Sequence, residues 1–354
     1  MSELLGTTRE AFDARIAELG YSRVHSSRLW KYLYREAQLD CCEMLELPPR
    51  LRARLAEEFA ATPIFATRET HSSDGFTTKY LVELADGRHV ETVVMRYQGR
   101  ATVCVSSQAG CAIGCVFCAT GQMGFGRNLT TGEILAQVLF AAATLQQSRT
   151  AEQGANPLRN VVLMGMGEPL LNYEAVIRAL QILSDNAGLS LAQKRLTLST
   201  VGVVPAIRRL ADERQPYSLA VSLHAATQEE RIRLVPAARA WPLQELMEAC
   251  RDYTMKLGRK IFFEWTLIDR VNDHPADAQS LGELLAGMPA HVNLIPLNPI
   301  VGFAGEASQL DRAREFQAVL HARGIPSTLR QKRGIDIAAG CGQLTVSAAS
   351  NEVT

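Results

Sequence analysis

The stretch ATVCVSSQAGCAIGCVFCATG, residues 101–121, decides the fold of this chain. It begins as a short apolar strand (101–107) and continues into a loop that carries Cys111, Cys115 and Cys118. Three thiolates at this spacing can bind one metal centre from a tight loop, and glycine lets the backbone wrap around it. A structural zinc site or an ordinary iron–sulfur cluster takes four protein ligands. Three cysteines without a fourth therefore predict a cluster with one iron left open to a substrate or cofactor.

Short β-type runs alternate with helical patterns after this loop. Repeated strand-then-helix units predict parallel strands with right-handed crossovers. About six such units follow the first strand, fewer than the eight of a closed TIM barrel, so we expect an α/β fold built on a partial (β/α)6 barrel. The expected strands are 160–165, 195–200, 218–224, 260–268, 291–297 and 327–330, the expected helices are 132–147, 172–185, 242–258 and 310–324, and 151–160 is expected to be a surface loop.

The region before the barrel has a different pattern. Apolar residues recur at helical spacing in 27–37 and 48–60, and the alternation in 78–95 around Asp86-Gly87 predicts an antiparallel hairpin. The division we expect is a small helical accessory domain (1–70), a β-hairpin extension (71–96), a core (97–336) and a C-terminal loop (337–354).

The composition is that of a globular protein. Of 354 residues, 47% are hydrophobic, and 37 basic residues balance 37 acidic ones, so net charge gives no argument for a polyanionic partner. No apolar run is long enough for a membrane span, and the N-terminus has no apolar signal region. We therefore expect a cytoplasmic protein, whose eight cysteines are not a set of structural disulfides.

The Cys-x3-Cys-x2-Cys spacing, with Phe117 before the last cysteine, resembles the radical S-adenosylmethionine (SAM) superfamily. The resemblance implies one 4Fe-4S cluster held by the three cysteines, with SAM chelated by the open iron. An electron from the cluster then cleaves SAM to methionine and a 5′-deoxyadenosyl radical. The alternatives for the loop alone are a chance enrichment in cysteine and a zinc site completed by a distant Cys or His.

Polar and glycine residues follow the carboxyl ends of the predicted strands, where ligands bind in such barrels. Glycine permits close backbone approach, and Glu168 offers a carboxylate to the SAM ammonium group. Each residue alone could be a turn or helix cap. Taken together they resemble the SAM-binding residues of the superfamily: Gly167, Glu168, Ser199, Ser222, Leu223, His224 and Asn298.

Nearly the whole chain resembles the RlmN/Cfr family of RNA adenosine methyltransferases, through VETVVM, GCAIGCVFCATGQMGFGRNLT, LMGMGEPLLNY, SLAVSLHA, FFEWTLIDRVND and the terminal CGQL. This resemblance implies that Cys341 is methylated by a first SAM. The radical from a second SAM activates that methyl group for addition to an adenine carbon. Cys104 then resolves the adduct through a transient disulfide with Cys341, and Glu91 accepts a proton. The glycines beside Cys341 favour an accessible loop, and the basic residues before it are expected to lower its thiol pKa.

The resemblance further implies methylation at adenine C2 in 23S rRNA, with tRNA as a further substrate. Methylation at C8, as by Cfr, is the close alternative, and a noncatalytic iron–sulfur or zinc RNA-binding protein is the distant one. The expected partners are RNA, positioned by the N-terminal domain, and an external one-electron donor such as flavodoxin, with a monomeric enzyme. Residues considered for RNA contact are Arg96, Arg100, Arg127, Arg330, Lys332 and Arg333, and Trp30, Tyr32 and Tyr34 are either a nucleobase-stacking set or a helix core; Cys41, Cys42 and Cys250 are expected to be buried and inert.

One position departs from the family pattern beside the proposed methyl carrier. The family usually has alanine immediately before the terminal cysteine, and this chain has Gly340. The cluster motif, both outer cysteines and Glu91 are intact, so the departure bears on the choice of substrate and leaves the chemistry in place.

Overall fold

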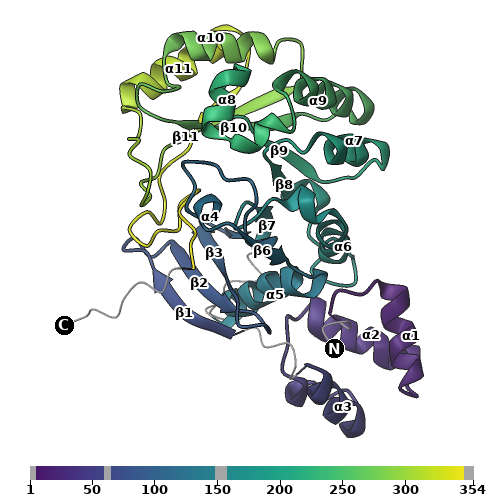
Figure 1. Cartoon of the computed structure of the whole chain (residues 1–354). Helices are drawn as coiled ribbons and strands as arrows, with labels where there is room; N and C mark the ends of the chain where they lie inside the picture. Colours follow the sequence, from purple (N-terminus) through teal and green to yellow (C-terminus); the bar gives the residue numbers. More distant parts are fainter. Residues whose placement is uncertain (1–4, 60–64, 148–157, 347–354) are drawn as a thin grey trace, which may run out of the picture.

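The computed structural model describes residues 5–59, 65–147 and 158–346. The loop predicted at 151–160 lies mostly outside these residues. The chain opens with helices that lie to one side of the sheet (Figure 1). They are α1 (Arg9–Glu18), α2 (Arg23–Tyr34), the 3-10 turn η1 (Cys41–Glu43) and α3 (Pro49–Phe59).

The aromatic side chains of α2 form the core of these helices. Trp30, Tyr32 and Tyr34 are all buried, and the Phe12 ring meets Trp30 edge-on at 5.0 Å. The Tyr34 hydroxyl accepts a hydrogen bond from Gly6 N. Of the two interpretations of this aromatic set, the helix core is confirmed, and no ring of the three is free to stack on a nucleobase.

A single ten-stranded sheet follows, and its spatial order is the order of the chain. The first four strands are antiparallel, and those from β4 onward are parallel. The predicted hairpin is present as β2–β3, and β1 adds a third strand to it. The strands are β1 (Phe65–His71), β2 (Thr77–Glu83), β3 (His89–Tyr97), β4 (Arg100–Cys104), β7 (Leu158–Leu163), β8 (Leu196–Thr200), β9 (Ser218–Ser222), β10 (Ile261–Leu267), β11 (Ala290–Pro296) and β12 (Ser327–Leu329).

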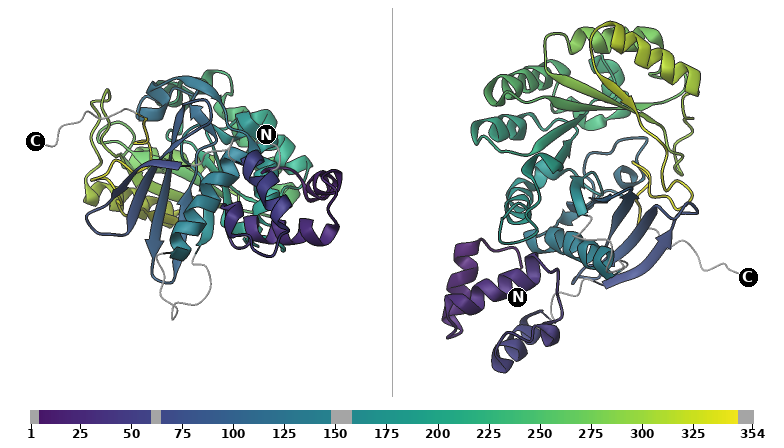
Figure 2. Two further views of the ribbon diagram at one scale, coloured as in Figure 1. Left: turned by 90° about the horizontal axis from the view of Figure 1, so that it is seen from below. Right: turned by 180° about the vertical axis from the view of Figure 1, so that it is seen from behind.

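Helices lie along the outer side of this strongly curved sheet (Figure 2). The four predicted helices are present as α5 (Thr131–Gln147), α6 (Tyr173–Leu183), α9 (Leu243–Leu257) and α11 (Leu310–Ala322). The prediction missed α7 (Val204–Asp212), α8 (Gln228–Leu234) and α10 (Pro275–Leu284), because each is short or carries proline in its first turn, which weakens the periodic signal. Shorter pieces are η3 (Pro169–Asn172), η4 (Gln193–Arg195), η5 (Pro236–Arg239), α4 (Ala119–Gln122) and the two-stranded sheet of β5 (Gln108–Gly110) with β6 (Phe125–Asn128).

A buried glutamine fixes the chain where β4 leads into the cysteine loop. Gln137 of α5 is fully buried, and its Oε1 accepts from Thr92 Oγ1 at 2.9 Å and from Ser106 N at 2.8 Å. Its Nε2 donates to Ser106 O at 3.0 Å. These bonds satisfy polar groups inside the apolar layer between helix and sheet. They hold the end of the first barrel strand, and hence the start of the loop, in one place.

Residues 334–346, here called the C-terminal segment, return from β12 to the antiparallel strands (Figure 1). Asp336 Oδ2 accepts from Ser73 N at 2.7 Å, and Ala338 O accepts from Lys79 Nζ at 3.2 Å. The segment therefore lies across the inner side of the sheet and joins its first strands to its last. Among the described residues, no helix is long and apolar enough to cross a membrane.

Candidate active site

A cavity of about 660 Å³ opens where the carboxyl ends of the parallel strands meet the C-terminal segment. We call it the central cavity. Of the residues predicted for the site, all except Glu91 and Leu223 line it. The fold thus brings together side chains that are up to 237 positions apart, from Cys104 to Cys341. Those that line it are Cys104, Cys111, Cys115, Cys118, Gly167, Glu168, Ser199, Ser222, His224, Asn298 and Cys341.

The cysteine loop depends on a glycine that no other residue can replace without strain. Gly110 has φ of +81°, and a Cβ there would stand 2.1 Å from Gly124 O. Cys111 N donates to Gly124 O at 2.8 Å, and Cys118 N donates to Cys115 O at 3.2 Å. The backbone therefore closes on itself and turns the three cysteine side chains to the cavity.

The three loop thiols are close enough to influence one another. Burial raises the pKa of Cys111 to about 12, with a smaller contribution from the charge of Cys118. Burial also raises the pKa of Cys115, with both other loop thiols adding to it. Within the described chain, no three Cys, His, Asp or Glu side chains stand as a single-ion site would need. A 4Fe-4S cluster binds its cysteines at separate irons, so thiols spread around a cavity suit it better than they suit zinc.

Cys104 and Cys341 meet across the cavity from opposite ends of the chain. Cys104 is the last residue of β4 and is buried. Burial raises its pKa to about 12, and the charge of Cys341 contributes to that shift. Both are free thiols. The expected pair of outer cysteines therefore lies in one site, within electrostatic range.

Cys341 is held by the backbone around it. Asn298 Nδ2 donates to Cys341 O at 3.0 Å, Gln343 Oε1 accepts from Gly340 N at 3.0 Å, and Ala119 N donates to Gly342 O at 2.7 Å. A Cβ at position 340 would stand 2.6 Å from Asn298 Nδ2. Glycine, where the family usually has alanine, thus leaves room for the amide that holds the cysteine.

The predicted lowering of the Cys341 pKa is wrong. Cys341 is exposed, as expected, but the space it is exposed to is the central cavity. Protein atoms surround that cavity, so the sulfur is partly shielded from bulk water. Burial and then the charge of Glu264 raise its pKa, and Arg330 opposes them only in part. The expected burial of Cys42 is also wrong, because it is exposed, whereas Cys41 and Cys250 are buried.

Glu91 lies beneath the C-terminal segment, beside the cavity and not among its lining residues. Its carboxylate is almost fully buried, and Oε1 accepts from Lys79 Nζ at 2.9 Å while Oε2 accepts from Thr345 N at 2.8 Å. Burial raises the pKa of Glu91, and the bond and charge of Lys79 oppose that shift. Since Lys79 also donates to Ala338 O, one ammonium joins the carboxylate to the C-terminal segment.

The loop after β7 holds the carboxylate of Glu168 in a buried position. Gly167 has φ of +99°, and a Cβ there would stand 2.5 Å from Gln108 Cβ. Glu168 accepts from Leu170 N at 3.0 Å and from Val201 N at 2.8 Å. Burial nevertheless raises the pKa of Glu168 to about 7. Gly167 lets this loop pack on Gln108, just before the cysteine loop, and Glu168 lines the central cavity.

His224 stands at the end of β9 in the left-handed region, with φ of +62°. Its Nδ1 accepts from Thr266 N at 3.0 Å, so the neutral ring carries its proton on Nε2. Burial lowers its pKa to about 3, which keeps the ring neutral. The Phe117 ring packs edge-on against it at 4.8 Å. A buried non-glycine residue in this backbone conformation is a strained position of the kind that occurs at functional sites.

The remaining predicted residues differ in their access to the cavity. Ser199, one residue before the end of β8, and Ser222, the last residue of β9, both line it. Leu223 does not, because its side chain is fully buried and its backbone N donates to Glu264 O at 3.0 Å.

Glu264 is a buried carboxylate of the cavity that the sequence analysis did not select. It lies on β10, in the run KIFFEWTLI, and accepts from Asn293 Nδ2 at 2.8 Å. Burial raises its pKa, and Arg330 opposes the shift. The available signal was an acidic residue inside a strand that is otherwise apolar, since such residues are rarely buried without a partner.

The basic residues considered for RNA contact separate into those that line the cavity and two that do not. One of the two is Arg96, whose Nη1 donates to Thr78 Oγ1 at 2.7 Å. Four of the six line the cavity, and Arg333 and Arg100 both lie over the Tyr97 ring, at 4.4 and 4.9 Å. Arg127 is instead held by Asp86 and Glu133, with N–O distances of 2.7 Å to each, so its charge is already neutralised. The four that line the cavity are Arg100, Arg330, Lys332 and Arg333.

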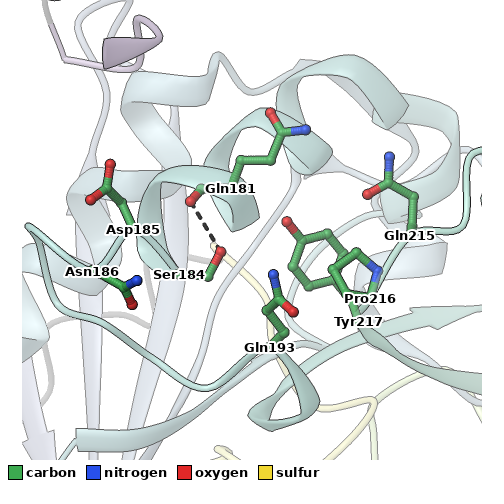
Figure 3. Close-up of a pocket in the computed structure, with 8 residues that line it drawn as sticks. All are labelled: Gln181, Ser184, Asp185, Asn186, Gln193, Gln215, Pro216 and Tyr217. Atoms are coloured by element: carbon green, nitrogen blue, oxygen red, sulfur yellow. Dashed lines mark hydrogen bonds between the residues drawn. The ribbon is translucent and has the colours of Figure 1, made fainter.

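A second depression of about 530 Å³ lies at the amino ends of β8 and β9 (Figure 3). It is lined by polar side chains, and Ser184 Oγ donates to Gln181 O at 3.1 Å within it. None of the predicted site residues is among its lining residues, and it contains neither a cysteine nor a basic side chain. The chemistry therefore belongs to the central cavity.

Comparisons with known proteins agree with this geometry. The profile of the Radical SAM superfamily matches residues 105–278. The crystal structure of a radical SAM methyltransferase from Sphaerobacter thermophilus superposes with a TM-score of 0.92 at 46% identity, covering 96% of this chain and 98% of that one. The fold and the cavity are thus those of a radical SAM enzyme, which sets aside a noncatalytic RNA-binding protein.

Full-length relatives narrow the class to a family. The dual-specificity RNA methyltransferase RlmN 1 of Myxococcus xanthus is 54% identical, over 97% of this chain and 94% of that protein. The probable dual-specificity RNA methyltransferase RlmN 2 of Opitutus terrae is 55% identical, over 92% and 82%. The chain belongs to the RlmN family of radical SAM RNA methyltransferases. Membership implies a 4Fe-4S cluster, SAM and an RNA substrate.

Proposed function

We propose that this enzyme methylates C2 of an adenosine in 23S rRNA, and an adenosine of tRNA, through a methyl group carried on Cys341. The observation that supports it is the single cavity that contains the cysteine loop together with Cys104 and Cys341. A plain SAM-dependent methyltransferase needs neither outer cysteine. An sp2 carbon of adenine has no lone pair to attack SAM, so its methylation calls for both a radical and a covalent carrier.

In this proposal Cys111, Cys115 and Cys118 hold a 4Fe-4S cluster whose fourth iron is open to SAM. The cluster, when bound, supplies the electron that releases a 5′-deoxyadenosyl radical from a second SAM, and that radical removes a hydrogen atom from the methyl group on Cys341. The chain's own residues orient SAM. Glu168 faces its ammonium group, Gly167 and Leu223 contribute backbone, and Ser199, Ser222, His224 and Asn298 complete the site.

Cys341 acts twice at the same sulfur. Its thiolate first attacks the methyl carbon of one SAM. An S–CH3 bond forms on Cys341, the bond from that carbon to the SAM sulfur breaks, and S-adenosylhomocysteine leaves. After hydrogen removal, the thiomethylene carbon bonds to adenine C2 and tethers the RNA to Cys341. Asn298 and Gln343 hold the backbone on each side of the cysteine during these steps.

Release of the RNA needs a second thiol. The radical adduct must give up one electron, for which the oxidised cluster would be the acceptor, and the C2 proton. Cys104 then attacks the Cys341 sulfur, the S–C bond breaks, and the methylene carbon takes up a proton to become methyl. The product is a Cys104–Cys341 disulfide, which a thiol reductant must open before the next turnover. We propose Glu91 as the acceptor of the C2 proton. Glu91 is buried beneath the C-terminal segment and does not line the cavity, so it can reach the C2 proton only after that segment moves.

Partners follow from the same proposal. Arg100, Arg330, Lys332 and Arg333 at the cavity bind RNA phosphates. The N-terminal helices (domain 1–70) position the RNA beside the extension (71–96), the core (97–336) and the C-terminal loop (337–354). An external one-electron donor such as flavodoxin reduces the cluster. We further propose that the enzyme acts as a monomer in the cytoplasm.

The test is mass spectrometry of modified nucleosides in rRNA and tRNA. Cells that lack the gene are complemented with wild-type protein or with Cys341→Ala. We expect 2-methyladenosine to return with the wild type alone, in both RNA classes. A returned 8-methyladenosine would replace C2 by C8 in the proposal, and a mark restored by Cys341→Ala would refute the carrier mechanism.

A further inference from the structure

Arg231 is a buried arginine whose charge has no partner in the described chain. It lies on α8, and its side chain is only 1% exposed. Nη2 donates to Val201 O, whereas Nε and Nη1 have no hydrogen-bond partner among the described residues. No carboxylate of those residues forms an ion pair with it. A guanidinium that is buried without a partner is strongly unfavourable, so such groups are normally paired with an anion.

The position of α8 indicates where an anion that pairs with Arg231 would lie. Val116 N donates to Leu234 O at 3.1 Å, so the helix end is bonded directly to the cysteine loop. Leu234 and Val235 pack with Ile113 and Phe117, and Cys115 lies against the same cluster.

Arg231 does not line the central cavity, whereas Cys115 and Val201 do. Its guanidinium therefore lies behind the wall that bears Cys115, on the side away from the space that SAM and the base would fill. A contact to a substrate in the cavity does not explain it. A four-iron cluster held by three thiolates is anionic and gains a further negative charge on reduction, and nearby charge and hydrogen bonds to its sulfurs set its reduction potential.

We propose that Arg231 is the counter-charge of the iron–sulfur cluster, placed behind Cys115 so that its free N–H groups stabilise the reduced state. The inference rests on the proposed function, because it requires the three cysteines to hold a cluster. Arg231 is thus a positioning and tuning residue. Without its charge, the cluster should be harder to reduce.

The experiment compares Arg231→Met and Arg231→Lys with Arg233→Met, an exposed arginine of the same helix. Reconstituted holoenzymes are titrated reductively without SAM, and the reduced cluster is followed by electron paramagnetic resonance. We expect a more negative midpoint potential for Arg231→Met, a value near wild type for Arg231→Lys, and none changed for Arg233→Met. A fully loaded Arg231→Met protein with the wild-type potential would overturn the proposal.

Thermal unfolding of apo and holo protein separates a counter-charge from a merely structural arginine. Removing an unpaired charge should leave apo Tm unchanged or higher, and should reduce the gain in Tm on cluster loading. Equal loss of Tm in both forms would contradict the proposal. If Arg231→Met retains no iron, Arg231→Lys must restore loading, and failure of both would also contradict it. Failure of the proposed function would instead appear in the wild type, as absence of about four irons per chain or of SAM cleavage.

Discussion

The two cysteine-bearing parts of the cavity, the loop Cys111–Cys118 and the C-terminal segment, are held in opposite ways. The loop closes mainly on its own neighbours, with Cys111 N bonded to Gly124 O and Cys118 N to Cys115 O, and has one backbone bond to a distant element, from Val116 N to Leu234 O. The C-terminal segment has bonds to Ser73, Lys79 and Glu91 on the antiparallel strands, and to Asn298 near the end of the barrel. The loop thiols, which we propose hold the cluster, are thus placed mainly by a local motif, whereas Cys341 is placed by contacts across the fold.

The largest effect should come from breaking the loop. Changing Cys111, Cys115 or Cys118 to Ala should abolish the 4Fe-4S absorbance and reduce SAM cleavage to background, because each thiolate holds a separate iron. Anaerobic reconstitution, iron analysis and quantification of 5′-deoxyadenosine measure both. SAM cleavage at the wild-type rate in any of the three variants would show that this loop does not hold the cluster.

Breaking the other region should leave the cluster intact and stop the chemistry at defined points. Cys341→Ala should carry no methyl group and transfer none, while its iron content stays that of the wild type.

Cys104→Ala should complete radical addition and then stall, because no second thiol can take up the Cys341 sulfur. The protein purified from cells should therefore carry covalently attached RNA, measured as a nuclease-sensitive mass shift and a high 260 nm absorbance.

The double variant Cys104→Ala, Cys341→Ala is the matched control, since no bridge can form without Cys341. It should be free of RNA. A clean Cys104→Ala protein with residual methyltransferase activity would show that Cys104 only packs beside the site.

The contrast between loop and segment also explains what the sequence could predict. The strand–loop–helix unit around Cys111 is contiguous, so its cysteine spacing and the alternation of strands and helices predicted the fold and the three loop thiols. The pairing of Cys104 with Cys341 came from the family resemblance, because no local pattern links positions 237 residues apart. Short helices with proline in the first turn, such as α7, gave too weak a period to be recognised.

Electrostatic details were harder still to predict. The basic residues before Cys341 suggested a lowered thiol pKa, but burial and Glu264, from a distant strand, outweigh Arg330. Arg127 was considered as a phosphate ligand, and its partner Asp86 lies 41 residues away. Such effects depend on which side chains meet in three dimensions, and the chain order does not contain that information directly.

A smaller effect should follow from loosening the contact between the C-terminal segment and the antiparallel strands at Lys79. Burial raises the Glu91 pKa and Lys79 opposes it, so Lys79→Met should raise that pKa further. A proton acceptor must be ionised, so the loss of activity on the acid side should move to higher pH. At low pH we expect resolution slower by about threefold to tenfold, well short of the 10²–10⁴ lost with a general base itself.

Single-turnover rates of adduct resolution across pH test this. Lys79→Arg, which keeps the charge, should retain the wild-type profile, and Lys260→Met serves as a control away from Glu91. An unshifted profile in Lys79→Met would separate Lys79 from the proton transfer.

The smallest effect is expected at Gln343. Its side chain accepts from Gly340 N and donates to Pro299 O at 2.9 Å, so Gln343→Ala removes two bonds next to Cys341. At about 1 kcal/mol for a hydrogen bond, methyl loading of Cys341 should slow about fivefold while Tm hardly changes. Timed mass spectrometry with isotope-labelled SAM measures it, with Gln193→Ala as control. Unchanged loading would mean that other bonds suffice to hold the segment.

The bond from Thr345 N to Glu91 Oε2 has a consequence for timing. While the C-terminal segment sits in place, Cys341 lines the cavity and Glu91 lies covered outside it, so in the proposed mechanism one conformation cannot serve both methyl loading and proton removal. The two half-reactions would then follow a fixed order, because the movement that gives Glu91 access to the cavity is a movement of the segment that carries Cys341. In the proposed mechanism this order keeps Glu91 away from the cavity while Cys341 takes up its methyl group.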